Sequence, residues 1–135
     1  MTPGVKTAQA ALAWAAAQNP GPWEAHSCHV AAACRAIAEH CEDLDEEKSY
    51  VLGLLHDIGR HAGVTSERHL IDGYRYCIGR GWEKAAQVCI SHAFMLQDIT
   101  TSIGTFDVTD EDYAFMKEFV AHAKYDDYDR LVQLC

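Results

Sequence analysis

Apolar residues recur along this chain at intervals of three and four, which is the period of a helix that buries one face. Three stripes show the pattern: Val30, Cys34, Ile37 and Cys41; Ala85, Val88, Cys89 and His92; and Phe115, Phe119 and Val120. No segment shows the convincing alternation of apolar and polar residues that is typical of strands. The sequence therefore predicts an all-α fold, built as a compact bundle of several helices.

Clusters of glycine, proline and polar residues divide the chain into helix-sized segments at 19–22, 59–63, 79–81 and 97–110. Between these breakers we expect helices near 5–18, 22–41, 46–57, 66–79, 82–93, 109–123 and 125–135. Ser66 is the expected cap of the fourth of these helices, and Thr109 with Asp112 resembles a capping box at the start of the sixth.

The length of 135 residues is close to the commonest size of one domain, so we expect a single domain over residues 1–135. The formal net charge of −9 would repel nucleic-acid phosphates, and we do not expect duplex DNA or RNA as a partner. A cation in a cleft can reverse the sign locally and attract a small phosphorylated molecule. Association into a homo-oligomer is compatible with the sequence.

Six cysteines, at positions 28, 34, 41, 77, 89 and 135, form no CxxC pair, and most lie among apolar residues at helical spacing. We interpret them as reduced core residues, which favours the cytoplasm. The alanine-rich segment 8–17 lacks the leucine, valine and isoleucine run of a signal peptide, so we expect an amphipathic first helix. No apolar run approaches the roughly 20 residues that span a membrane, and no membrane partner is expected.

An imidazole and a carboxylate, His56 and Asp57, follow each other directly after the apolar run 51–55. Burying both groups without partners would be costly, and a divalent cation removes that cost by accepting a nitrogen and an oxygen donor. This donor set suits zinc, iron, manganese, cobalt or nickel. The competing interpretation is a pair that only caps the helix. We favour a metal centre on His56 and Asp57.

Three further histidines lie where helices could direct them to the same centre. His26 opens the apolar stripe of the second predicted helix and is expected to point inward. His69 lies near the start of the fourth predicted helix, and His92 ends the stripe of the fifth. Each alone is as readily a core or capping residue. Together with His56 and Asp57 they are predicted ligands, with His69 and His92 completing a second metal position.

These residues resemble those of the HD-domain metal-dependent phosphohydrolases. Leu-Leu-His-Asp-Ile-Gly-Arg at 54–60 is similar to the naming motif of that family, and the segment that begins at His26 is similar to its first histidine motif. The resemblance runs from Trp23 to Cys135. It implies that His26, His56 and Asp57 bind a first metal, that His69 and His92 bind a second, and that Asp57 bridges the two. One or two divalent ions of iron, manganese, zinc, cobalt, nickel or magnesium are implied.

The family also uses a final aspartate after an apolar helical run that reads like residues 131–135, where this sequence ends. Three interpretations follow: the aspartate comes directly after Cys135, Asp129 replaces it, or the site is incomplete. We favour the first, because position 136 would share a helix face with Val132 and Asp129.

The resemblance implies hydrolysis of a phosphate ester or phosphoanhydride in a small molecule, with a nucleotide as the favoured substrate and Asp57 as the catalytic residue. Arg60 could bind a phosphate through two hydrogen bonds; its competing role is an exposed helix cap. No Walker motif or Gly-x-Ser-x-Gly elbow offers another means of activation. Two alternatives use the same fold: a non-catalytic module that binds a phosphorylated ligand, and a di-iron oxygenase.

Overall fold

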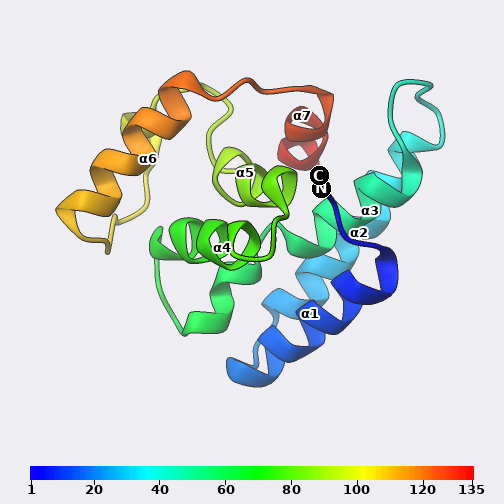
Figure 1. Cartoon of the computed structure of the whole chain (residues 1–135), viewed down its shortest axis with the longest axis horizontal. Coiled ribbons are helices and arrows are strands. Elements are labelled where there is room, and N and C mark those ends of the chain that lie inside the picture. Colours follow the sequence, from blue (N-terminus) through cyan, green and yellow to red (C-terminus); the bar gives the residue numbers. More distant parts are fainter.

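The computed structural model describes all residues from 1 to 135 and contains helices but no β-strand (Figure 1). The all-α prediction is therefore confirmed. The helices are α1 (Val5–Gln18), α2 (Trp23–Ala38), α3 (Glu46–Leu55), α4 (Arg68–Ile78), α5 (Glu83–Ser91), α6 (Asp110–His122) and α7 (Asp127–Leu134). Two short 3₁₀ helices, η1 (Ile58–Ala62) and η2 (Ile99–Thr101), lie in segments that we expected to be irregular.

The main core forms where α1, α2 and α3 pack together and meet α5 and α7. α2 and α3 approach each other closely because Gly53 has no side chain: a Cβ atom there would lie 2.6 Å from the Cα of Ala31. The facing residues of both helices are fully buried, including Cys34 of α2 and Leu52 of α3. This close contact brings the start of α2 beside the end of α3.

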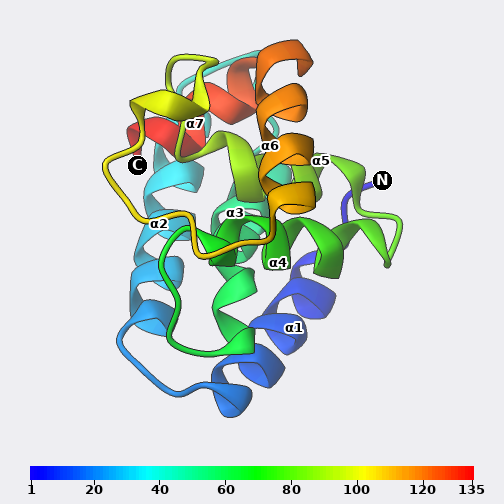
Figure 2. The ribbon, with the colours of Figure 1, turned by 90° about the vertical axis from the view of Figure 1, so that its left-hand side faces the viewer.

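A smaller apolar cluster joins α4 and α5 to α6 and η2. α6 lies on the far side of α4 and α5 from α1, α2 and α3 (Figures 1 and 2). It turns Met116 and Val120 inward, whereas Phe115 of the predicted stripe is 40% exposed. The predicted stripe was therefore only partly correct: Val120 is buried as predicted, but Met116 is buried in place of Phe115.

The end of α3 differs from the prediction in a way that matters for the site. The α-helix ends at Leu55, His56 is its C-cap, and Asp57 leaves the helical region with φ −109° and ψ 16°. The chain then turns directly into η1. The prediction of a helix to residue 57 was wrong by two residues. As a result, His56 and Asp57 lie at the junction of two helical elements.

Only one of the two predicted caps is present. The side chain of Thr109 accepts a hydrogen bond from the backbone N–H of Asp112, as predicted, although the Asp112 carboxylate pairs with Arg75 and does not return to the cap. Ser66 does not cap α4. The carboxylate of Asp107 instead accepts hydrogen bonds from the backbone N–H groups of Ser66 and Arg68, at 2.9 and 2.8 Å.

All six cysteines are free thiols. Cys34, Cys77 and Cys89 are buried as predicted, whereas Cys28 is exposed and the other two are partly exposed. No helix of the structure has the length and apolar character that crossing a lipid bilayer requires.

Candidate metal centre

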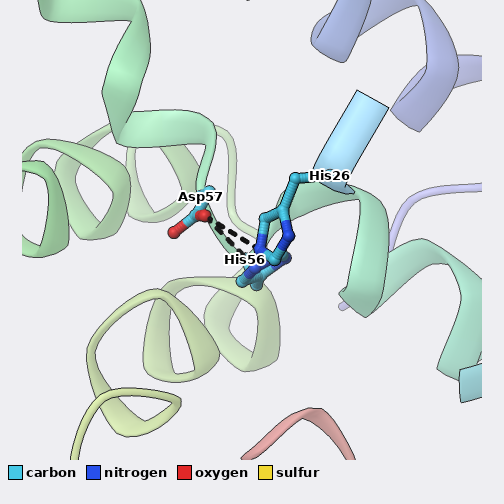
Figure 3. A group of neighbouring side chains, drawn as sticks. All are labelled: His26, His56 and Asp57. Atoms are coloured by element: carbon cyan, nitrogen blue, oxygen red, sulfur yellow. Dashed lines mark ion pairs between the residues drawn. The ribbon is translucent and has the colours of Figure 1, made fainter. Parts of the chain in front are cut away.

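Four histidines from four different parts of the chain surround the carboxylate of Asp57. The Nε2 atoms of His26 and His56 lie 3.6 and 3.3 Å from its Oδ2 atom (Figure 3). The Nε2 atoms of His69 and His92 each lie 3.3 Å from its Oδ1 atom. These five residues are the ones that the sequence predicted as ligands, and the structure brings all of them together.

The carboxylate divides the four histidines into two pairs, and each pair forms a group of three ligand residues together with Asp57. His26 and His56 face one oxygen of Asp57, and His69 and His92 face the other. Within each group the ligand atoms lie within 4.8 Å of one another. This arrangement has the form that a bridging aspartate between two cation positions would need.

Backbone carbonyl groups fix the orientation of three of the imidazole rings. The Nδ1 atoms of His56, His69 and His92 lie 2.6, 2.7 and 2.9 Å from the carbonyl oxygens of Gly53, Ser66 and Val88, respectively. A carbonyl oxygen can only accept, so Nδ1 carries the proton and donates it. In the neutral form of each ring, Nε2 then carries the lone pair that a cation would bind, and this atom faces Asp57. Such support from a backbone carbonyl is typical of histidines that bind metal.

The titratable groups at this centre shift one another's pKa values. Burial opposes ionisation of Asp57, but hydrogen bonds from His56, His69 and His92 outweigh it and hold the pKa of this carboxyl below its usual range. Burial lowers the pKa of His26, and the neighbouring His56 lowers it further, which favours the neutral ring. Hydrogen bonds from Nε2 need a proton there in addition to the one on Nδ1, and a bound cation would take the place of that second proton beside the carboxylate.

A divalent cation fits this donor set. Nitrogen and oxygen ligands lie about 2.1 Å from such an ion, so two ligands in tetrahedral geometry are about 3.4 Å apart. The four distances between the imidazole nitrogens and the Asp57 oxygens are 3.3 to 3.6 Å. Imidazole and carboxylate ligands together suit first-row transition metals and zinc. His26, His56 and Asp57 could hold one cation, and Asp57, His69 and His92 another.

A close backbone contact between η1 and α4 brings His69 near Asp57. A Cβ atom on Gly59 of η1 would lie 1.8 Å from the carbonyl oxygen of His69 and 2.5 Å from the backbone nitrogen of Gly73. Only glycine permits α4 to approach η1 this closely. From the sequence, Gly59 is expected as a helix breaker and as part of the motif at 54–60, and its contact with α4 was not predicted. The signal that could have revealed this contact is the pair of glycines itself, one in each element.

The centre is open to solvent on one side only. The side chain of His26 is 55% exposed, while those of His56, His69 and His92 are 4, 8 and 15% exposed. The prediction that His26 points inward was therefore wrong in part: its ring reaches Asp57 from the surface. His26 is thus the ligand candidate with the largest contact with solvent.

Arg60 lies in η1, three residues after Asp57. It lines a cavity of about 280 Å³ with the segment 19–23, Gly63 and Val64. Asn19 donates a hydrogen bond of 2.8 Å to the backbone carbonyl of Arg60, and the Arg60 guanidinium lies 3.4 Å from the carbonyl oxygen of Thr65. Besides burial and the neighbouring histidines, the positive charge of Arg60 also lowers the pKa of His26. The positive charge of Arg60 therefore influences His26, the exposed histidine of the centre.

Asp129 takes no part in either group of ligands. Its carboxylate is fully buried and accepts hydrogen bonds from the Lys84 ammonium at 2.5 Å, the Ser91 hydroxyl at 2.6 Å and the Gln87 amide at 3.0 Å. It also accepts from the backbone N–H of Asp126 in a capping box of α7. The interpretation in which Asp129 replaces the final ligand is not supported, because other groups occupy both of its oxygens.

Comparison with known protein families gives one match. Residues 11–77, just under half of the chain, match the HDOD domain, a relative of the HD domain. The matched segment runs from α1 into α4 and contains His26, His56, Asp57 and His69, but not His92. The comparison with curated proteins finds no match, and neither does the comparison with solved structures.

Proposed function

Starting from an HD-related chain with four histidines around one aspartate, we propose that this protein is a metal-dependent phosphohydrolase. One observation carries the proposal. Three imidazole rings are tied through Nδ1 to backbone carbonyls and direct Nε2 at one buried carboxylate. A structural histidine needs no such common target, whereas a metal centre does.

The residues around the opening have separate tasks in this reaction. A divalent cation, when bound, supplies Lewis acidity and lowers the pKa of water. The fixed rings of His56, His69 and His92 keep their Nε2 atoms ready to bind, so little reorganisation is needed. Asp57 offers one oxygen to each group. Arg60 binds a phosphate with its planar guanidinium and neutralises the charge that develops on it.

The proposed substrate is a small phosphate ester or anhydride, with nucleotides as the first class to test. The cavity beside Arg60 is about 280 Å³, near the lower bound of roughly 300 Å³ for small-molecule sites. Its walls include Pro20, Trp23 and Val64, which suit an organic group attached to the phosphate. The net charge of −9 disfavours large polyanions, while Arg60 and a bound cation favour a small one.

The experiment begins with elemental analysis of protein purified without chelator. We expect one or two equivalents of a divalent transition metal, and loss of this metal in the His56→Ala and Asp57→Ala variants. His122→Ala is the matched control, because His122 is exposed and pairs only with Glu118 at 3.3 Å. Full metal content in both site variants would contradict the proposal. Release of phosphate from a panel of nucleotides then tests the activity.

The HDOD match supports a second candidate, a module that binds a phosphorylated ligand without hydrolysing it. Metal-loaded protein that binds a nucleotide and returns it unchanged would select this candidate. Bound iron together with oxygen consumption, and no phosphate release from any nucleotide, would instead select an oxygenase on the same fold.

A further inference from the structure

Helix α7 binds the end of α5 on both sides of His92. Ser91 donates from its hydroxyl to Asp129 at 2.6 Å, and the Gln133 amide donates to the carbonyl oxygens of Ser91 and Phe94 at 2.9 and 3.3 Å. The Arg130 guanidinium donates to the carbonyl oxygen of Met95 at 2.7 Å. Three residues of one face of α7 thus hold the segment 91–95, and His92 is its second residue.

We propose that Asp129, Arg130 and Gln133 are positioning residues that hold His92 in reach of Asp57. The proposal rests on the metal centre proposed above. In this proposal α7 supplies no metal ligand. It acts on the centre through hydrogen bonds to the Ser91 hydroxyl and to backbone carbonyls on either side of His92.

The end of α5 needs such support because the last carbonyl groups of a helix have no partner within it. α5 ends at Ser91, and after a short turn at 92–94 the chain forms no regular element before η2 at Ile99. Gln133 supplies a donor to the carbonyl of Ser91 just before His92 and to the carbonyl of Phe94 just after it. Without these bonds the carbonyl of Ser91 would keep only the N–H of Phe94, at 3.0 Å, so the end of the helix, and His92 with it, would be held less firmly.

Asp129 fixes α7 at the correct place along α5. Its buried carboxylate is bound by Lys84, Gln87 and Ser91, which are spaced along one face of α5. This contact connects the two helices over most of the length of α5, so α7 has one register relative to His92. The ring of His92 is held in turn by the Val88 carbonyl at 2.9 Å, which leaves Nε2 at 3.3 Å from Asp57.

The expected effect is large because metal ligation tolerates displacements of only about 0.2 Å. Loss of a contact that supports a ligand typically lowers metal affinity by about 10- to 100-fold. The effect should fall on the group formed by Asp57, His69 and His92. The group formed by His26, His56 and Asp57 should keep its affinity, because α7 makes no hydrogen bond to those residues.

The test compares Gln133→Ala with a matched control, Gln97→Ala, in the full chain. Gln97 also donates two hydrogen bonds from its amide to backbone carbonyls, but these belong to Val120 and Ala123 at the end of α6. Cobalt(II) titrations followed by calorimetry and visible absorption measure both cation positions. We expect Gln133→Ala to weaken the second position by about 10-fold or more and to change its visible spectrum. Gln97→Ala should change neither.

Equal affinity for the second cation in Gln133→Ala and wild-type protein would overturn the inference, as would an equal loss in both variants. Nitrogen NMR of the His92 ring in metal-free protein provides a readout that does not depend on metal. Gln133→Ala should lose the single Nδ1–H tautomer, whereas Gln97→Ala should keep it, and an unchanged ring in both would also refute the role. Wild-type protein that binds no metal contradicts the proposed function, and the NMR comparison then still decides whether α7 positions His92.

Discussion

Replacing Gly59 by alanine tests how the fold assembles the second group of ligands. The added methyl carbon would lie 1.8 Å from the carbonyl oxygen of His69, whereas ordinary contact begins at 3.4 Å, so η1 and α4 must separate by about 1.6 Å. The two nearest atoms, the carbonyl oxygen of His69 and the backbone nitrogen of Gly73, belong to the backbone, so no change of side-chain rotamer relieves the clash. A shift of this size exceeds by far the roughly 0.2 Å that metal ligation tolerates.

We therefore expect Gly59→Ala to lose the second cation and to be less stable by about 3 kcal/mol, the upper end of the usual cost of overpacking. Urea unfolding of metal-free protein measures the stability, and metal analysis measures the stoichiometry. Gly4→Ala is the control, since it adds the same methyl group where nothing lies within 4 Å. A Gly59→Ala variant with wild-type stability and two bound cations would show that the approach of η1 to α4 is not required.

Gly73→Ala refines the test because its clash is of a different kind. A Cβ atom at Gly73 would lie 2.9 Å from the Sγ atom of Cys89, a side chain that can be shortened. The double variant Gly73→Ala/Cys89→Ala should recover part of the stability lost in Gly73→Ala. No recovery would show that the atoms that remain, the Cβ atom of residue 89 at 3.1 Å and the backbone nitrogen of Gly59 at 3.2 Å, set the limit.

Three further predictions concern the ligands and the buried polar groups. His69→Ala or His92→Ala should lower the metal stoichiometry from two towards one, as measured by elemental analysis. Asp129→Ala should lower the free energy of unfolding by about 1 to 3 kcal/mol in urea titrations, because the donors of Ser91 and Gln87 lose their buried acceptor while the Lys84 ammonium keeps only Asp126, at 2.8 Å. Burial and the charge of Asp129 raise the pKa of Tyr125 to about 12. The folded state thus favours the protonated phenol of Tyr125. This contribution to the free energy of unfolding is complete below pH 10 and should disappear as the pH rises towards 12. In an alkaline absorbance titration, Tyr125→Phe should remove one late step of tyrosine ionisation.

The sequence predicted the fold class, and it identified the five candidate ligands that the structure brings together, because both depend on local pattern. The breakers and the period of three and four together placed every α-helix; the errors were a few residues at helix ends, as at Leu55, and the buried face of α6. The ring orientation of His56 is also local, since its Nδ1 donor finds a carbonyl three residues earlier in its own helix.

The approach of the elements to one another depends on contacts between distant residues, and the sequence could not reveal it. Asp107 gives an example. Its carboxylate binds the backbone N–H of Ser66, and the carbonyl of Ser66 in turn accepts the Nδ1 proton of His69. The orientation of a predicted ligand thus depends on a residue 38 positions further along the chain, in a segment that we expected to be a polar loop. Local pattern identifies which side chains can act, whereas the convergence of their Nε2 atoms on Asp57 is a property of the packed helices.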